Sequence, residues 1–180
     1  MSDRILIRDD NGQVVDIGGF RTKASLTLDA SNETKVEPLF RVTGSIQVNK
    51  LYGVVTTVVG ANHTAAYWRL NDQTAQEDIS LNTGTTISSA GVGSILTRRS
   101  LVNAALILVN STAGHISDPV AATAPDYFMP FVMVQKTGSI NTDIEYVYTT
   151  TTQPTTGKMD FFLVWQPLSS NAAVSPQASD

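Results

Sequence analysis

Two histidines are the only side chains in this sequence with the ordinary chemistry of a general base near neutral pH: His63 and His115. His63 stands in "ANHT" and His115 in "AGHIS", both typical of turns, and neither lies near a nucleophile elbow. We therefore predict two exposed loop histidines rather than members of a catalytic triad. Because the chain has no cysteine, two imidazoles are also too few for a typical zinc site.

Carboxylates offer a second route to catalysis, since a glycosidase needs two acids facing one bond. Strand faces could bring acids together from three places in the chain, namely Glu77-Asp78, Asp143 with Glu145, and Asp160. Most chains of this length contain such acids, so they do not by themselves indicate an enzyme.

Two short segments resemble ligand-binding loops. Asp9-Asp10-Asn11-Gly12 carries oxygen ligands suited to calcium, but it lacks the alternating acids and distant Glu of an EF-hand. The segment "AGVGS" resembles a phosphate loop, yet no Lys follows its glycines and no helix pattern begins there. We predict that the protein is not an enzyme and has no cofactor and no metal site.

The composition of the chain argues against further classes of function. The 180 residues carry a net charge of -4 with dispersed Lys and Arg, whereas nucleic-acid binding needs a basic face. The N-terminus lacks the apolar stretch of a signal peptide, and no window is long enough for a membrane span. We expect a protein made in a reducing cytosol, with no nucleic acid and no membrane as partner.

Strand signals dominate the chain. The segment "ASLTLDA" alternates with period two, placing Leu26 and Leu28 on one face. Further strands are expected at 39–48, 52–59, 65–70, 78–81, 94–98, 104–110, 128–135, 143–150 and 158–166. The apolar run 101–109 is the best helix candidate, but its neighbours favour a buried strand. Short strands without helices predict an all-β antiparallel β-sandwich, with the jelly roll as one of its possible topologies.

The two ends of the chain have their own patterns. Residues 4–17 read as a β-hairpin around Asn11-Gly12, followed by a Gly18-Gly19 joint. This hairpin is either a separate arm or an edge hairpin of the main sheet. We divide the chain into an arm (1–19), a sandwich domain (20–167) and a disordered tail (168–180), because "PLSSNAAVSPQASD" is rich in proline and small polar residues.

The hairpin also supplies the candidate contact residues. Apolar side chains fall on both faces of a two-stranded ribbon, which cannot bury them by itself. The residues predicted to contact a sister subunit or another assembly are Ile5, Leu6, Ile7, Val14, Val15 and Ile17.

The segments "RVTGSIQVNKLYGVVTTVVGANHTAAYWRLND" and "DISLNTGTTISSAGVGSILTRRS" resemble the small structural proteins of tailed bacteriophages. The shared pattern is TGxIxV, then LxGxVTT, an Asn-Thr turn and a glycine-containing lead into "LT", and it covers about residues 42–100. Capsid decoration (cement) proteins and some tail and fibre components share this style. The resemblance implies a virion protein and assigns a role to no individual residue.

Together, the resemblance and the absence of a catalytic motif favour a capsid decoration protein. Such a protein binds the major capsid protein on the outer shell of the virion and stabilises that shell, and we expect a homo-oligomer, with a trimer favoured. A tail, baseplate or receptor-binding β module remains open as an alternative, and so does a carbohydrate-binding module.

Overall fold

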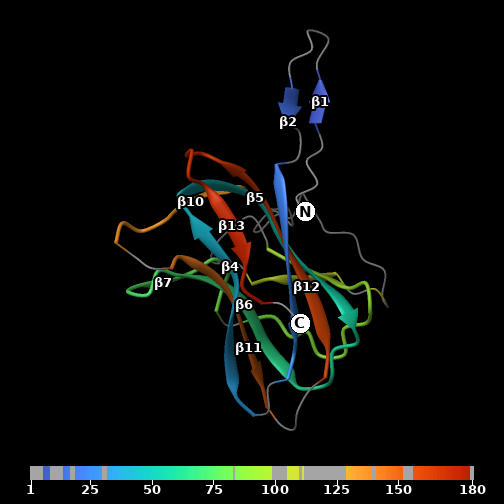
Figure 1. Ribbon diagram of the computed structural model, residues 1–180. Helices are drawn as coiled ribbons and strands as arrows, with labels where there is room; N and C mark the ends of the chain where they lie inside the picture. The colour runs from blue at the N-terminus through green and yellow to red at the C-terminus, as the bar shows by residue number, and fades with distance from the viewer. Residues whose placement is uncertain are drawn as a thin grey trace, which may run out of the picture.

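The computed structural model describes residues 19–29, 32–82, 84–98, 105–109, 111, 129–138, 141–151 and 156–178, together with the backbone of 6–8 and 14–16. Every regular element in these ranges is a β-strand (Figure 1). No helix in the described ranges is long and apolar enough to cross a membrane. The all-β class expected from the alternating sequence is therefore confirmed.

Two antiparallel sheets pack against each other, and a third, two-stranded sheet stands apart from them in Figure 1. The small sheet is β1 (Leu6–Arg8) with β2 (Val14–Asp16). The first large sheet runs β3-β12-β5-β8-β9, with β10 also paired to β5. Its strands are β3 (Phe20–Thr27), β5 (Ser45–Thr57), β8 (Ile95–Thr97), β9 (Ile107–Val109), β10 (Phe131–Val134) and β12 (Lys158–Pro167).

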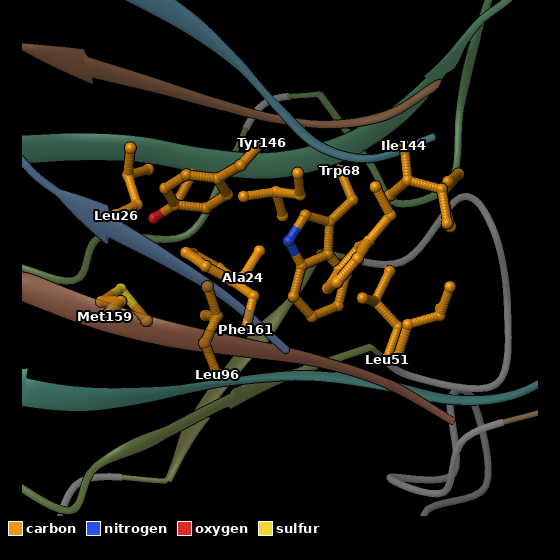
Figure 2. Packing of buried hydrophobic residues seen from close by; sticks show 14 of the residues in the cluster. Ala24, Leu26, Leu51, Trp68, Leu96, Ile144, Tyr146, Met159 and Phe161 are labelled. Carbon is orange, nitrogen blue, oxygen red and sulfur yellow. The ribbon is translucent and has the colours of Figure 1, made fainter. Parts of the chain in front are cut away.

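The second large sheet runs β13-β4-β11-β6-β7. Its strands are β4 (Thr34–Thr43), β6 (His63–Asn71), β7 (Gln76–Asp78), β11 (Asp143–Thr150) and β13 (Ala173–Pro176). The inner faces of the two sheets enclose one core, where Trp68, Tyr146 and Phe161 are fully buried (Figure 2). Leu26 and Leu28 point into this core, as their alternation predicted.

The strand expected over 39–48 is two strands in different sheets. Strand β4 ends before Gly44, which has φ of 66°, and the chain then enters β5 in the other sheet. A Cβ at this position would lie 2.6 Å from the Ser169 hydroxyl, so both the conformation and the space favour glycine. Phe40 and Ile46 still reach the same core because the two sheets face each other.

The gap between the strands expected at 39–48 and 52–59 is absent, because β5 runs through Asn49 and Lys50. On the neighbouring strand β12, Val164 lies opposite Lys50 while Trp165 lies opposite Val48. Asn49 is thus the extra residue of a β-bulge, which accommodates a turn-forming residue without ending the strand.

The C-terminal segment expected to be a disordered tail is, in part, a strand. β13 pairs antiparallel with β4, and Val174 lies opposite Val42. The Gln177 amide donates to the Leu39 carbonyl at 2.9 Å, and Val174 packs against the core. The sandwich therefore extends at least to residue 178 instead of ending at 167, with Pro176 in an edge strand, where proline is tolerated.

Candidate interaction surfaces

The N-terminal hairpin exists, but its register differs from that of a tight turn. Arg8 lies opposite Val14, with five residues between them. A two-residue turn at Asn11-Gly12 would have placed Arg8 opposite Val15. Of the predicted contact residues, Ile5 and Ile17 lie outside the described ranges. Only backbone is described for Leu6, Ile7, Val14 and Val15, so the contact role of all six remains a prediction.

The base of the hairpin is fixed on the sandwich. Gly19 has φ of 69°, and a Cβ there would clash with the carbonyl oxygen of Trp165. The next residue, Phe20, stacks on the Trp165 ring with centroids 4.9 Å apart. Gly19 is therefore a tightly packed position, and any freedom of the arm has to arise before it in the chain.

A groove of about 800 Å³ opens beside this base, between β3 and β13. These strands are edges of opposite sheets, and they meet where the Ser25 amide donates to the Ala178 carbonyl at 3.2 Å. Among the described residues that line the groove, Arg21 and Lys23 are charged and none carries a carboxylate. The lining residues are Phe20, Arg21, Thr22, Lys23, Phe162, Trp165, Pro167, Ser169, Ser170, Ala172, Ala173, Val174 and Pro176.

An aromatic pair lies on the outer face of the first large sheet. Tyr52 and Phe162 stack with centroids 5.1 Å apart, and the Arg21 guanidinium lies 5.2 Å from the centre of the Phe162 ring. Sugar-binding platforms present open ring faces to the ligand, whereas these rings face each other and a cation. The pair therefore gives little support to a carbohydrate-binding module.

A second apolar surface is the edge strand β10. Val132 and Val134 are 60% and 62% exposed, and Met129 just before the strand is 47% exposed. β10 pairs with β5 and with no other strand in the described ranges. An edge strand with outward valines is suited to pairing with another chain.

The prediction that His63 is an exposed loop residue is wrong. His63 begins β6, is only 1% exposed and lies beside Tyr148, with ring centroids 5.5 Å apart. Neither ring nitrogen has a hydrogen-bond partner among the described residues. Burial lowers the pKa of the imidazole from 6.5 to about 4, so His63 is neutral near pH 7. His115 lies outside the described ranges.

The expected acid pairs do not form a glycosidase site in the described ranges. Glu145 accepts from the Arg69 guanidinium at 2.6 Å and from the Asn71 amide at 2.8 Å. Asp143 receives two hydrogen bonds from Arg41, at 3.0 and 3.2 Å. Each carboxylate is thus held in an ion pair with an arginine, whereas the two acids of a glycosidase face one substrate bond.

The other acids named as glycosidase candidates, Asp160, Glu77 and Asp78, do not face a common substrate position either. Asp160 forms an ion pair with Lys23 at 2.7 Å and accepts from the Ser25 hydroxyl at the same distance. Glu77 and Asp78 are exposed on the edge strand β7. The acids of this surface therefore serve ion pairs or face solvent.

Of the two segments that resemble ligand-binding loops, only "AGVGS" lies in the described ranges. No group of three or more potential ligands gathers there around a metal position. "AGVGS" forms turns, with the Ser94 amide donating to the Gly91 carbonyl at 3.0 Å, and no helix follows. Asp9-Asp10-Asn11-Gly12 lies outside the described residues.

No protein-family model, curated protein or solved structure matches this chain. The surfaces described above therefore have to be interpreted from their own chemistry.

Proposed function

We propose that this chain is a non-enzymatic structural protein of a tailed-phage virion, and in particular a decoration protein that binds the outer capsid shell. The observation that carries the proposal is the separate β1–β2 ribbon, which stands on a sandwich whose described ionisable groups are paired, buried or exposed without a catalytic arrangement. A protein of this form acts through contacts. The phage assignment itself rests on the sequence resemblance over about residues 42–100.

The physical argument begins with the two edges of the small sheet. A three-residue ladder whose strands pair with no other described strand is marginally stable in water. The apolar side chains of the arm stabilise it only when another surface covers them, and each Å² of apolar surface buried then contributes about 25 cal/mol. An arm of this kind is well suited to fastening a compact body to a preformed lattice.

The proposed partners follow from this role. The major capsid protein is the lattice, and a homotrimer is the favoured form of the bound protein. Several weak arm contacts acting together in an oligomer give much tighter attachment than one arm does. In a virion, the protein would lie on the capsid surface after synthesis in the host cytoplasm.

The test is binding of purified protein to particles that lack it. We expect the full chain to saturate a fixed number of shell sites, and a chain lacking residues 1–17 to lose attachment while its body stays folded. Sedimentation with particles measures occupancy, and circular dichroism checks the fold. Wild-type occupancy by the truncated chain would place the contact surface on the sandwich, and binding to purified tails alone would favour the tail module instead.

A further inference from the structure

We propose that the outer face of the first large sheet is a second contact surface, and that it docks on an acidic surface of the capsid shell. The inference deepens the proposed function and rests on its claim that the protein attaches to that shell. The arm keeps its proposed role, and the sheet face adds a contact made by the sandwich itself.

Strand register defines which side chains form this face. Phe162 and Val164 point outward, because they alternate with buried neighbours on β12. Residues that lie opposite each other on neighbouring strands share a face of the sheet. The residues opposite Val164 are Arg21 and Lys50, and those opposite Phe162 are Lys23 and Tyr52. β3, β12 and β5 thus present one continuous surface on the side of the sheet away from the core.

Basic side chains predominate on this face. The outward cations of its described strands are Arg21, Lys23, Lys50 and Lys158, and the only outward acid of these strands is Asp160. Asp160 forms an ion pair with Lys23 at 2.7 Å, so it balances one of the cations. The chain as a whole carries a net charge of -4. A positive face on an acidic protein favours a partner that presents carboxylates.

The outer face of the second sheet has no comparable excess of cations among its described strand residues. Arg41 donates to Asp143 at 3.0 Å, and Arg69 donates to Glu145 at 2.6 Å. Each of these arginines therefore has its own carboxylate. The positive charge is a property of one face and not of the sandwich in general.

The face also carries apolar side chains. Val54 and Ile95 lie opposite each other on β5 and β8, and Ile95 is 39% exposed. They continue the surface that begins with the stacked rings of Tyr52 and Phe162. An apolar area bordered by charge is typical of a protein contact. Duplex DNA, by contrast, binds mainly through dense contacts between cations and phosphates, so the apolar part favours a protein partner.

The face begins where the arm leaves the body. Gly19 packs against the carbonyl of Trp165, the residue after Val164, and Arg21 is two positions further along the chain. Figure 1 shows the arm projecting beyond the end of the sandwich at which β3 begins. A shell surface that covers the arm can therefore also reach Arg21 and Lys50, and two contacts made by one body strengthen each other.

A second copy of the chain is a poorer occupant of this face. Two such faces packed on each other would bring the cations of both copies together, which opposes binding. The outer face of the second sheet offers Asp143 and Glu145, but both are already paired with arginine. The charges therefore favour the shell over a sister subunit.

Charge reversal tests the basic part of the face. Arg21→Glu with Lys50→Glu, in the full chain, should weaken binding to particles that lack the protein by about tenfold or more. The binding that remains should also depend less on salt. The matched control is Lys35→Glu with Lys136→Glu, which makes the same change in net charge at partly exposed positions outside the face. The control should change the dissociation constant by less than about twofold, and circular dichroism checks the fold of each variant.

Each other result overturns the inference in a different way. Equal losses for the two variants, with normal binding of the wild type, would remove the face and leave the proposed function standing. Absence of particle binding by the wild type would contradict the proposed function and the inference together. A change in oligomeric mass on charge reversal, without particles, would assign the face to a second copy. Binding of duplex DNA by the wild type that the reversal abolishes would assign it to nucleic acid.

The apolar part of the face has its own matched pair of variants. Ile95 on β8 and Val36 on β4 are β-branched and are both 39% exposed, but they belong to opposite sheets. Ile95→Ser should weaken particle binding by about threefold or more, because it removes apolar surface from the contact. Val36→Ser should leave the dissociation constant within about twofold of the wild type. Equal binding by these two variants, measured by sedimentation with particles, would contradict docking through this face.

Discussion

The sandwich and the hairpin arm are built from the same kind of strand, but they differ in what covers those strands. β5, β11 and β12 each pair on both sides, and their inner residues share one core. β1 and β2 share three residue pairs and join no other described strand. The sandwich thus contains the contacts that stabilise it, whereas the arm depends on a surface outside its own sheet.

The core of the sandwich should give the largest effect. Phe161 is fully buried, with its ring centroid 4.8 Å from that of Tyr146, so Phe161→Ala should cost about 3–5 kcal/mol of unfolding free energy. The neighbouring Phe162 lies on the outer face and is the matched control, with an expected loss of about 1 kcal/mol. Urea unfolding measures both, and equal losses would contradict the described packing.

Acid should weaken the sandwich through His63. Its pKa is about 4 when folded and 6.5 in an unfolded chain, so the unfolded state binds the proton first as the pH falls. The full contribution is present above pH 6.5, and about 3 kcal/mol is lost between pH 6.5 and 4. Unfolding of wild type and His63→Phe across this window measures the difference. Parallel pH profiles would show that His63 is not buried.

The ion pairs on the outer face of β11 should give a smaller effect. Glu145→Gln removes the charge opposite Arg69, whose side chain is 14% exposed, and should cost about 1–3 kcal/mol. Asp29→Asn is the exposed counterpart, because Asp29 is 65% exposed in its pair with Lys35, and should cost less than about 0.5 kcal/mol. Thermal unfolding of both variants tests whether burial makes the difference.

These elements also show which features the sequence could predict. β11 and β12 lie within a residue of their expected ranges because alternating or β-branched residues mark their length. The sequence predicts a continuous strand through Gly44, where the chain in fact changes sheets, and a turn at Asn49, which in fact forms a β-bulge inside a strand. The backbone conformation at Gly44 and at Asn49 depends on the strand that each residue lies beside in the fold.

The groove and the burial of His63 depend on contacts distant in the chain. β3 and β13 are separated by most of the sequence, and their positions follow from the pairing of β3 with β12 and of β13 with β4. One signal was present: Ala172, Val174 and Ala178 fall on alternate positions, and all three pack against the core. The proline and serine residues of the same segment are typical of a disordered tail and outweighed this alternation in the prediction. His63 lies two residues before the strand expected at 65–70, and a β-bulge at Thr64 interrupts the alternation of the strand so that His63 is buried.

Removing the arm should have the smallest effect on the fold and so gives the sharpest contrast between the two regions. Deletion of residues 1–17 keeps Gly19, Phe20 and the Trp165 stacking intact, and breaks no described strand pair of the sandwich. The unfolding free energy per subunit should therefore change by less than about 0.5 kcal/mol at concentrations where both proteins are monomeric. The oligomeric mass, by contrast, should fall toward 19.3 kDa at high micromolar concentration, if the arm holds the proposed oligomer together. Light scattering and urea unfolding on the same samples separate these quantities. A large loss of stability in the dilute truncated chain would mean that the arm packs on its own sandwich, and the distinction between a self-sufficient body and an arm that needs a partner would fail.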